Sequence, residues 1–335
     1  MNPETIPPEA QMMQFILGKW ISKPVNIAAK LGISDILAEG SRNIDALSEI
    51  TETHPDSLYR MMRALAGVGI FTETEDRVFA NTPLSECLME GRLKSASLMF
   101  HSDWHDKMWD NLLCSIKTGD SAFEKAHGEP VFEWFGKNPE AARVFHEANS
   151  YKAAFSHRAI VEVYDFSGIN TLTDVGGGFG GLMFEILEAN PSVKGIIADL
   201  PETVRHLSEI IKQKKSGDRV RAAECDFFRE IPGGSDACLL SHILHDWPDE
   251  ACITILKNCR KALDSEGKLL IVEAVISPGN SSSVAKLLDL EVLLMGGGRE
   301  RTEEEFRNLM ESSGFRLSRI IHTRENVSVI EGIPG

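Results

Sequence analysis

Three features of other protein classes are missing from this sequence. No uninterrupted apolar run approaches the ~20 residues of a membrane-spanning helix, which excludes a transmembrane segment. The start, Met1-Asn2-Pro3-Glu4, has neither the basic stretch nor the apolar run of a secretory signal. The six cysteines form no C-x-x-C pair and no ligand-like cluster, which favours reduced, buried thiols and no metal centre. We therefore expect a cytoplasmic protein.

Positive charge is also scarce. The 335 residues include 35 Lys and Arg against 50 Asp and Glu, a net charge of −15. This excess of negative charge argues against nucleic acid and against an anionic membrane as partners. The length suggests about two domains.

The pattern along the chain divides it into three segments. Residues 1–95 are mostly helical, residues 96–160 are helical and rich in aromatic side chains, and residues 161–335 alternate strands with helices. Strands are expected at 171–175, 194–199, 219–225, 237–241 and 268–274, with a hairpin from 322 to 331. This alternation predicts an α/β fold with a parallel, doubly wound sheet. We expect the aromatic segment to wall an apolar pocket, although a helical interface core explains any single ring more simply.

The N-terminal segment has a winged-helix outline over residues 44–83, with helix, turn, helix and a short hairpin. Residues 41–90 hold four Arg, no Lys and nine carboxylates, whereas a DNA reader needs the opposite charge balance. A dimerisation role therefore fits better. The amphipathic stretch 12–20 places Met13, Ile16, Leu17 and Trp20 on one face, which predicts a homodimer through residues 1–95, with packing inside a single chain as the alternative.

A glycine-rich loop directly follows the first expected strand of the sheet. Gly176, Gly178 and Gly181 match the G-x-G-x-x-G pattern of dinucleotide sites. Asp174, at the end of the strand, would repel the pyrophosphate of NAD, but it would attract the ammonium group of S-adenosylmethionine. The loop therefore favours S-adenosylmethionine as cofactor, with NAD as the alternative.

Acidic residues follow the next two strands as well. Asp199 ends the second strand, where a carboxylate can accept hydrogen bonds from both ribose hydroxyls. Asp226 and Phe227 end the third, where they offer an acceptor for the adenine amino group and an apolar ring for its face. Either acid alone is more simply a cap after a strand. Together with the glycine loop, they indicate a nucleoside site.

A histidine after the fourth strand is the candidate catalytic residue. His245 can remove a proton from an acceptor hydroxyl, because the ordinary pKa of histidine lies near working pH. Glu273, at the end of the fifth strand, is placed to accept from the other imidazole nitrogen. His242, His245 and Asp246 form an alternative metal site, but no third ligand of convincing spacing follows.

The motifs together resemble those of the S-adenosylmethionine-dependent small-molecule O-methyltransferases, a family with plant, animal and bacterial members. The resemblance covers nearly the whole chain. It rests on Asp174-Val-Gly-Gly-Gly, Asp199-Leu200-Pro201, Asp226-Phe227-Phe228, His245-Asp246-Trp247 and the run from Gly296 to Thr302.

The resemblance implies a Rossmann-like class I methyltransferase domain with an N-terminal winged-helix dimerisation domain. By motif position, His245 resembles the catalytic base, and Glu273 and Glu300 resemble the carboxylates that flank it. The positions that contact the cofactor in relatives correspond to Gly176, Asp199, Leu200, Asp226 and Phe227, with His242 at an adenine-side position; the glycine loop itself adds Asp174 and Gly178 as candidates. Ser241 stands where plant members carry Lys, and His242 stands where some animal and bacterial members carry Arg.

We therefore predict methyl transfer to a hydroxyl of a small, aromatic molecule, with His245 as general base and no metal. Three alternatives stay open. A relative that binds S-adenosylmethionine without methylating would keep the same loop. An NAD-dependent oxidoreductase conflicts with Asp174. A winged-helix regulator conflicts with the negative charge of residues 41–90.

Overall fold

The computed structural model describes residues 6–335, and these divide into two compact units. One unit comprises the chain up to Asp106 together with residues 135–151, and the other comprises residues 107–134 and 152–335. Residues 1–5, on which the signal prediction rests and with which the expected domain 1–95 begins, lie outside the described residues. Of the described helices, none is long and apolar enough to cross a bilayer.

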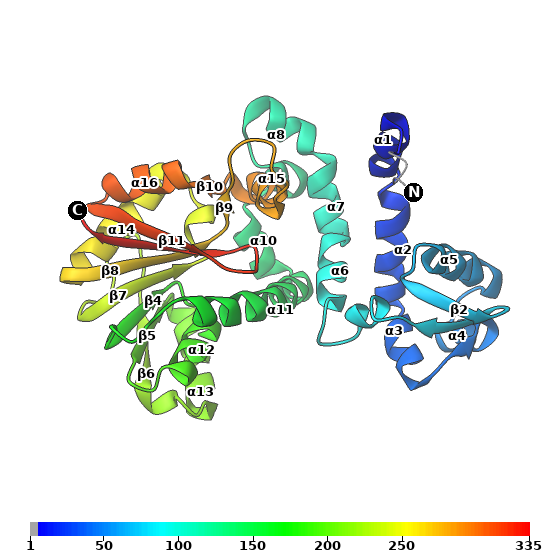
Figure 1. The fold of residues 1–335 in the computed structure, drawn as a ribbon, viewed down its shortest axis with the longest axis horizontal. Helices are drawn as coiled ribbons and strands as arrows, with labels where there is room; N and C mark the ends of the chain where they lie inside the picture. The colour runs from blue at the N-terminus through cyan, green and yellow to red at the C-terminus, as the bar shows by residue number, and fades with distance from the viewer. Residues whose placement is uncertain (1–5) are drawn as a thin grey trace, which may run out of the picture. The chain divides into compact units, whose positions relative to one another are not determined.

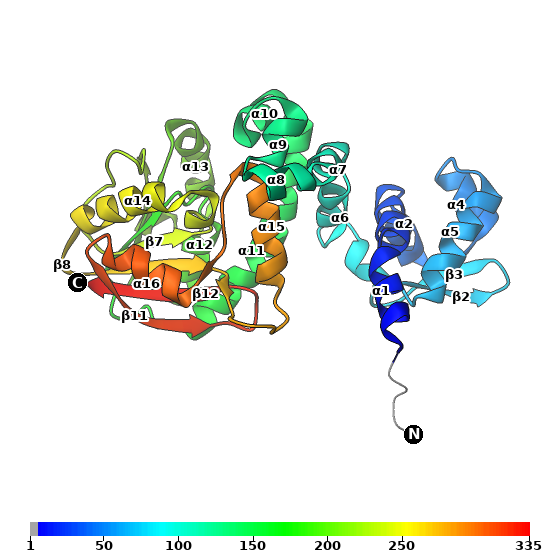
Figure 2. The same ribbon diagram turned by 90° about the horizontal axis from the view of Figure 1, so that it is seen from above.

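The first unit is built on short helices and a small antiparallel sheet. Its elements are α1 (Pro8–Ile16), α2 (Lys19–Lys30), α3 (Ile33–Ile36), β1 (Arg42–Asn43), α4 (Ile44–Ile50), α5 (Pro55–Gly67), β2 (Phe71–Glu75), β3 (Val78–Asn81) and α6 (Lys94–Phe100). The sheet order is β1-β3-β2, and the β2–β3 hairpin lies beside α5 (Figure 1, Figure 2). Apolar positions at helical spacing, such as Leu58, Met62 and Leu65 on α5, pack around Phe79 from the hairpin. Helix, turn, helix and hairpin therefore follow in the predicted order.

The amphipathic stretch 12–20 is not one helix, which corrects the prediction at this point. A turn at Leu17–Gly18 separates α1 from α2. Gly18 N–H bonds the Phe15 carbonyl at 3.1 Å, a tighter turn than an α-helix makes. The apolar character of the stretch persists across the turn, since Phe15 is 81% exposed and Trp20 is 72% exposed.

The aromatic segment of the chain forms two clusters, one in each unit. Trp104, Phe135 and Phe145 pack together in the first unit, with ring centroids 4.7–6.5 Å apart. Phe123 packs against His127 and Trp134 in the second. The helices that carry these residues are α7 (Asp103–Asp110), α8 (Leu112–Thr118), α9 (Ala122–His127), α10 (Val131–Lys137) and α11 (Pro139–Val163). Trp104, Phe123 and Phe135 are buried core, whereas Phe132 and Phe155 of the same segment are exposed.

The second unit is organised by a seven-stranded sheet in the order β11-β12-β8-β7-β4-β5-β6 (Figure 1). Its strands are β4 (Thr171–Val175), β5 (Lys194–Asp199), β6 (Val220–Glu224), β7 (Ser235–Ser241), β8 (Leu263–Glu273), β11 (Phe315–His322) and β12 (Ser328–Pro334). Strands β4 to β8 run parallel, whereas β12 is antiparallel to both β8 and β11. The prediction of a Rossmann-like sheet is confirmed, and the expected terminal hairpin is the β11–β12 pair.

Each face of the sheet is covered by helices over its own core. Helices α11, α12 (Gly181–Ala189) and α13 (Pro201–Gln213) share one core with β4 and β5, which includes Leu172, Phe184 and Leu207. Helices α14 (Asp249–Ala262) and α16 (Glu303–Glu311) share the other, which includes Leu256 and Phe306. The remaining helix, α15 (Val284–Gly296), and the short strands β9 (Val275–Ile276) and β10 (Arg301–Thr302) follow β8 along the chain.

Strand order reverses next to β4, because the chain leaves β4 for β5 on one side and later returns to β7 on the other. The carboxyl ends of parallel strands at such a point border the crevice in which α/β proteins bind ligands. The residues predicted for the cofactor and for catalysis, apart from Glu300 directly before β10, lie at or just after the carboxyl ends of β4, β5, β6, β7 and β8.

Candidate active site

The glycine loop after β4 is packed too closely for side chains at Gly176, Gly177 and Gly180. Gly176, Gly178 and Gly180 have positive φ angles of 70°, 55° and 79°, a region that suits glycine. A Cβ on Gly176 would lie 2.6 Å from Ile243 Cδ1, and one on Gly177 would lie 2.7 Å from Asp174 Cγ. The loop therefore lies directly on Asp174 and on the segment after β7, and it leads into the N-terminus of α12.

Two of the predicted cofactor carboxylates lie at this loop. Asp174 is only 2% exposed, and burial together with the charge of Asp199 raises its pKa to about 7. Asp199 Oδ2 accepts from Gly178 N–H at 2.8 Å, and Oδ1 accepts from Leu200 N–H at 2.7 Å. Each carboxylate oxygen has more than one acceptor position, so Asp199 can hold the loop and still bind hydroxyls. Two carboxylates beside the loop suit a cationic nucleoside better than a pyrophosphate.

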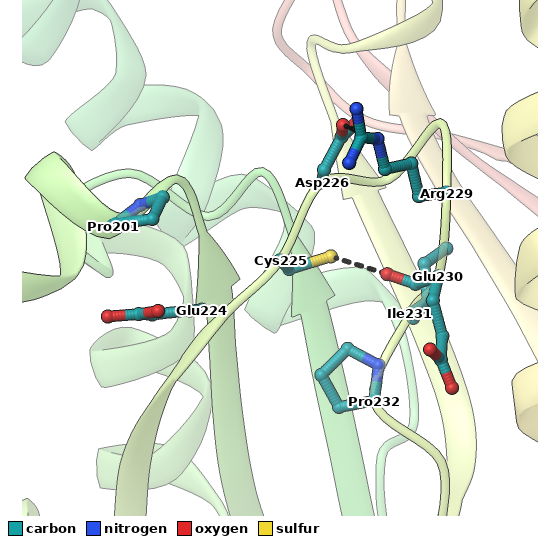
Figure 3. Close-up of a pocket in the computed structure, with 8 residues that line it drawn as sticks. All are labelled: Pro201, Glu224, Cys225, Asp226, Arg229, Glu230, Ile231 and Pro232. Atoms are coloured by element: carbon teal, nitrogen blue, oxygen red, sulfur yellow. Dashed lines mark hydrogen bonds and ion pairs between the residues drawn. The ribbon is translucent and has the colours of Figure 1, made fainter.

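The predicted adenine contacts lie beyond β6. Asp226 accepts from Phe228 N–H at 3.0 Å and pairs with Arg229 Nε at 3.2 Å. It lines an open cavity of about 410 Å³ together with Pro201, Glu224, Cys225, Arg229, Glu230, Ile231 and Pro232 (Figure 3). Phe227 contacts the glycine loop instead, since its ring carbon Cε1 would lie 3.6 Å from a Cβ on Gly176. Phe227 is therefore the residue of this pair that reaches the glycine loop.

His245 sits on a short turn after β7, the 3-10 helix η4 (Leu244–Asp246). Its Nδ1 lies 2.8 Å from Glu300 Oε1, and its Nε2 lies 3.6 Å from Asp246 Oδ1. The His245 side chain is 14% exposed, whereas the Glu300 carboxylate is fully buried. His242, which precedes the turn with a φ of 53°, has its ring centroid 5.4 Å from that of His245.

The contact predicted for Glu273 is wrong in one respect. Glu273 does not bond the imidazole: its Oε1 accepts from the backbone N–H groups of Leu244 at 2.6 Å and His245 at 3.1 Å. Glu300 takes the position at Nδ1 instead. Glu273 ends β8 and lies under the turn, so it reaches the backbone of the turn before it reaches the ring. Both residues flank His245: Glu273 accepts from its backbone N–H, and Glu300 contacts its imidazole ring.

The charges around His245 give it an unusual basicity. Burial alone lowers the pKa of His245, but the hydrogen bond to Glu300 and the charges of Asp246 and Glu273 raise it to about 9. Burial raises the pKa of Glu273 to about 7, against the opposite effect of the His245 charge. The second oxygens of both glutamates, Oε2, are buried without a hydrogen-bond partner among the described residues. The site therefore stabilises a proton on the imidazole.

Two residues at the site were missed by the sequence reasoning. Arg301 is fully buried and donates to the carbonyls of Leu244 and Trp247. Gly298 lies so close to the turn that a Cβ there would be 2.1 Å from the His245 carbonyl oxygen. Both belong to the run from Gly296 to Thr302, but the sequence of this run does not show that the arginine is buried. Among the described residues, no His, Cys, Asp and Glu side chains are grouped to hold a metal ion.

Comparison with known protein families gives two matches along the chain. An O-methyltransferase domain matches residues 109–316, and an O-methyltransferase dimerisation domain matches residues 13–91. The first match includes every candidate site residue. The second begins within α1 and covers α2 to α5 and the β2–β3 hairpin of the first unit.

Individual proteins are similar over the whole length. The phenazine O-methyltransferase PhzM of Lysobacter antibioticus is 38% identical over 332 residues, which cover 98% of this chain and 97% of that protein. The crystal structure of LaPhzM superposes with a TM-score of 0.91 at 37% identity, covering 98% of this chain and all of that one. The SAH-bound structure of CalO1, a methyltransferase in calicheamicin biosynthesis, has a TM-score of 0.86 at 27% identity, with coverage of 99% and 100%.

Proposed function

The chain belongs to the S-adenosylmethionine-dependent O-methyltransferases of small molecules, and on this premise we propose that His245 is the general base of the reaction. The enzyme methylates a hydroxyl of a small aromatic molecule. The family assignment leaves no support for the NAD-dependent oxidoreductase or for the winged-helix regulator. The observation that carries the role of His245 is its 2.8 Å contact through Nδ1 with buried Glu300, which leaves Nε2 for the acceptor.

When bound, S-adenosylmethionine supplies a methyl group on a sulfonium sulfur, which is already a good leaving group. The protein then has to align the acceptor oxygen with the methyl carbon and take up the hydroxyl proton. His245 Nε2 accepts that proton as the oxygen–carbon bond forms and the carbon–sulfur bond breaks, and the electron pair of that bond stays on sulfur. Glu300 stabilises the resulting imidazolium.

The high basicity of His245 suits this step. At neutral pH a group with a pKa of about 9 is mostly protonated in the free enzyme. A sulfonium cation nearby disfavours a second positive charge and lowers that pKa. With the cofactor bound, His245 is therefore neutral more often and can accept a proton. Asp246 Oδ1 lies 3.6 Å from Nε2, on the side where the acceptor binds.

The cofactor residues are proposed from their places around the loop. Gly176 and Gly178 let the backbone approach the ligand, and buried Asp174 supplies negative charge beneath it. Asp199 binds the ribose hydroxyls with its remaining acceptor positions. Leu200, Asp226, Phe227 and His242, which follow β5, β6 and β7, would hold the adenine group.

We also propose that two copies of the chain associate through the first unit. The dimerisation domain spans residues 13–91. Helix α1 has no buried residue, and Phe15, Ile16 and Trp20 expose 65–81% of their surface on α1 and the start of α2. Apolar surface of this extent is stabilised by burial against another molecule.

Two alanine variants test the division of roles between the histidines. His245→Ala should lower turnover by ~10²–10⁴-fold, the usual range for a lost general base, with S-adenosylmethionine affinity close to native. His242→Ala should weaken cofactor affinity more than it lowers turnover. Turnover is measured by S-adenosylhomocysteine release with phenolic acceptors, and affinity by calorimetry.

His322→Ala is the matched control, because His322 lies in the β11–β12 hairpin, where its Nδ1 is 3.0 Å from Ser328 Oγ. It should leave both quantities unchanged. Native turnover in His245→Ala would overturn the proposed base.

A further inference from the structure

Among the described residues, Arg301 has the largest side chain that is fully buried, and none of its surface is exposed. A guanidinium stays charged at all physiological pH values, and its burial is costly unless every donor finds an acceptor. Core positions of this size are normally filled by apolar side chains. The charge at this position therefore needs an explanation beyond packing.

The contacts of Arg301 converge on the turn that carries His245. Nη1 donates to the Leu244 carbonyl at 2.9 Å, and Nη2 donates to the Trp247 carbonyl at 2.8 Å. These two residues bracket His245 and Asp246. Nε and Nη2 also donate to Asp249 Oδ1, at 3.1 and 2.8 Å, at the start of α14. The planar fork of the guanidinium thus spans the turn and ties it to the first residue of the following helix.

The same segment of chain holds the rest of the turn. Arg299 N–H donates to the His245 carbonyl at 2.9 Å, at the place where Gly298 allows close approach. Glu300, between the two arginines, contacts the imidazole itself. From the opposite side, Glu273 accepts from the backbone N–H groups of the turn. Residues 298–301 therefore contact both the backbone carbonyls of the turn and the imidazole ring of His245.

We propose that Arg301 is a positioning residue that sets His245 against Glu300. Arg301 fixes the backbone on both sides of His245, and its neighbour Glu300 fixes the ring, so the guanidinium determines how the imidazole meets the carboxylate. This inference rests on the proposed role of His245 as base. A lysine keeps the charge but has no planar fork, and its single ammonium cannot span Leu244 and Trp247 in this geometry.

The test compares Arg301→Lys with Arg260→Lys. Arg260 also donates to backbone carbonyls, those of Leu263 and Asp264, at the far end of the same helix α14. We expect Arg301→Lys to lower kcat by about tenfold or more while the Kd for S-adenosylmethionine stays within about twofold. We also expect the acid limb of the kcat/KM profile to move to lower pH, because a looser contact with Glu300 raises the pKa of His245 less. Arg260→Lys should keep native kcat and a native pH profile, whatever its Tm.

A purely structural role predicts a different result. Arg301→Lys would then lower Tm while kcat per folded enzyme and the acid limb stay native, and that outcome overturns the proposal. If Arg301→Lys does not fold, Asp249→Asn replaces it, since it removes the carboxylate partner and leaves the guanidinium on its two carbonyls. Asp249→Asn should shift kcat and the acid limb in the same direction by less, and native values for both would overturn the inference.

Failure of this proposal is distinguishable from failure of the proposed function. Loss of turnover in His245→Ala combined with a native Arg301→Lys enzyme refutes only the positioning role. Native turnover in His245→Ala refutes the base and the positioning role together.

Discussion

Replacing Glu300 by Gln removes one charge from the site and changes little else. The two side chains have almost the same shape, and the Gln amide oxygen can still face His245 Nδ1, 2.8 Å away. The Glu300 carboxylate is fully buried, so water does not screen its charge as it would at the surface. The variant therefore isolates the contribution of the charge to the basicity of His245.

The magnitude follows from the kind of bond that is lost. A hydrogen bond to a charged group contributes ~1.5–3 kcal/mol, and each pKa unit corresponds to about 1.4 kcal/mol. The pKa of His245, raised to about 9 in the native enzyme, should therefore fall by ~1–2 units in Glu300→Gln. Turnover at the alkaline plateau should fall by less than the matching ~10–100-fold, because the proton is only partly transferred in the transition state.

The assay is the pH dependence of kcat/KM for a methylated acceptor at saturating S-adenosylmethionine. The acid limb of Glu300→Gln should lie ~1–2 pH units below that of the native enzyme. Glu303→Gln is the control: Glu303 pairs with Arg307 on the exposed side of α16, and its loss should leave the profile unmoved. An acid limb in Glu300→Gln that coincides with the native one would refute the assignment of Glu300 as the partner of His245.

Three further outcomes are expected. Because the pKa of Asp174 is raised to about 7 and ionisation adds a negative charge under the glycine loop, calorimetry should show S-adenosylmethionine binding more tightly as pH rises through about 7, with a similar change for S-adenosylhomocysteine, which keeps the ammonium group; an affinity that does not change across this pH range would contradict this. The pKa of His245 in the folded protein lies above its ordinary value of 6.5. The contribution of the protonated imidazole to stability is therefore complete below pH 6.5 and is lost as pH rises through about 9. Denaturant unfolding should accordingly find Glu300→Gln more destabilised at about pH 6 than at about pH 9.5. The double change Phe15→Ser and Trp20→Ser should give a monomer mass by light scattering, whereas Val68→Ser, at a 49% exposed position elsewhere on the first unit, should stay dimeric; a dimer in the double variant would exclude this surface as the interface.

The elements next to the glycine loop could be predicted residue by residue from the sequence. Strand β4 ends where the loop begins, β5 ends at Asp199, and α12 starts at Gly181, because glycines and strand-end acids mark these boundaries locally. The break between α1 and α2 was missed, since Leu17 and Gly18 continue the apolar pattern and only the backbone turns. Periodicity reports which side chains share a face, but it does not report where the helix is interrupted.

The partners of His245 were harder to predict, because they depend on contacts distant in sequence. Glu273 and Glu300 are both acidic residues close to the end of a strand or turn, and nothing in their local sequence says which one reaches the ring. The 3-10 geometry of η4 decides it, since it turns the backbone N–H groups toward Glu273 and Nδ1 toward Glu300. The burial of Arg301 follows from the same tertiary arrangement.

The position of β12 has a consequence for how the enzyme is made. Ribosomes deliver residues in order, yet β12 inserts between β8 and β11, and its Ser328 lies opposite Glu273 at the end of β8. Until residues 328–334 leave the exit tunnel, β8 presents an open edge of unpaired N–H and C=O groups, a known route to aggregation. A nascent chain that already contains the glycine loop, the base and both glutamates still lacks the strand that closes this edge. We therefore expect protection by chaperones during synthesis to matter most in the interval between the emergence of β8 and that of β12.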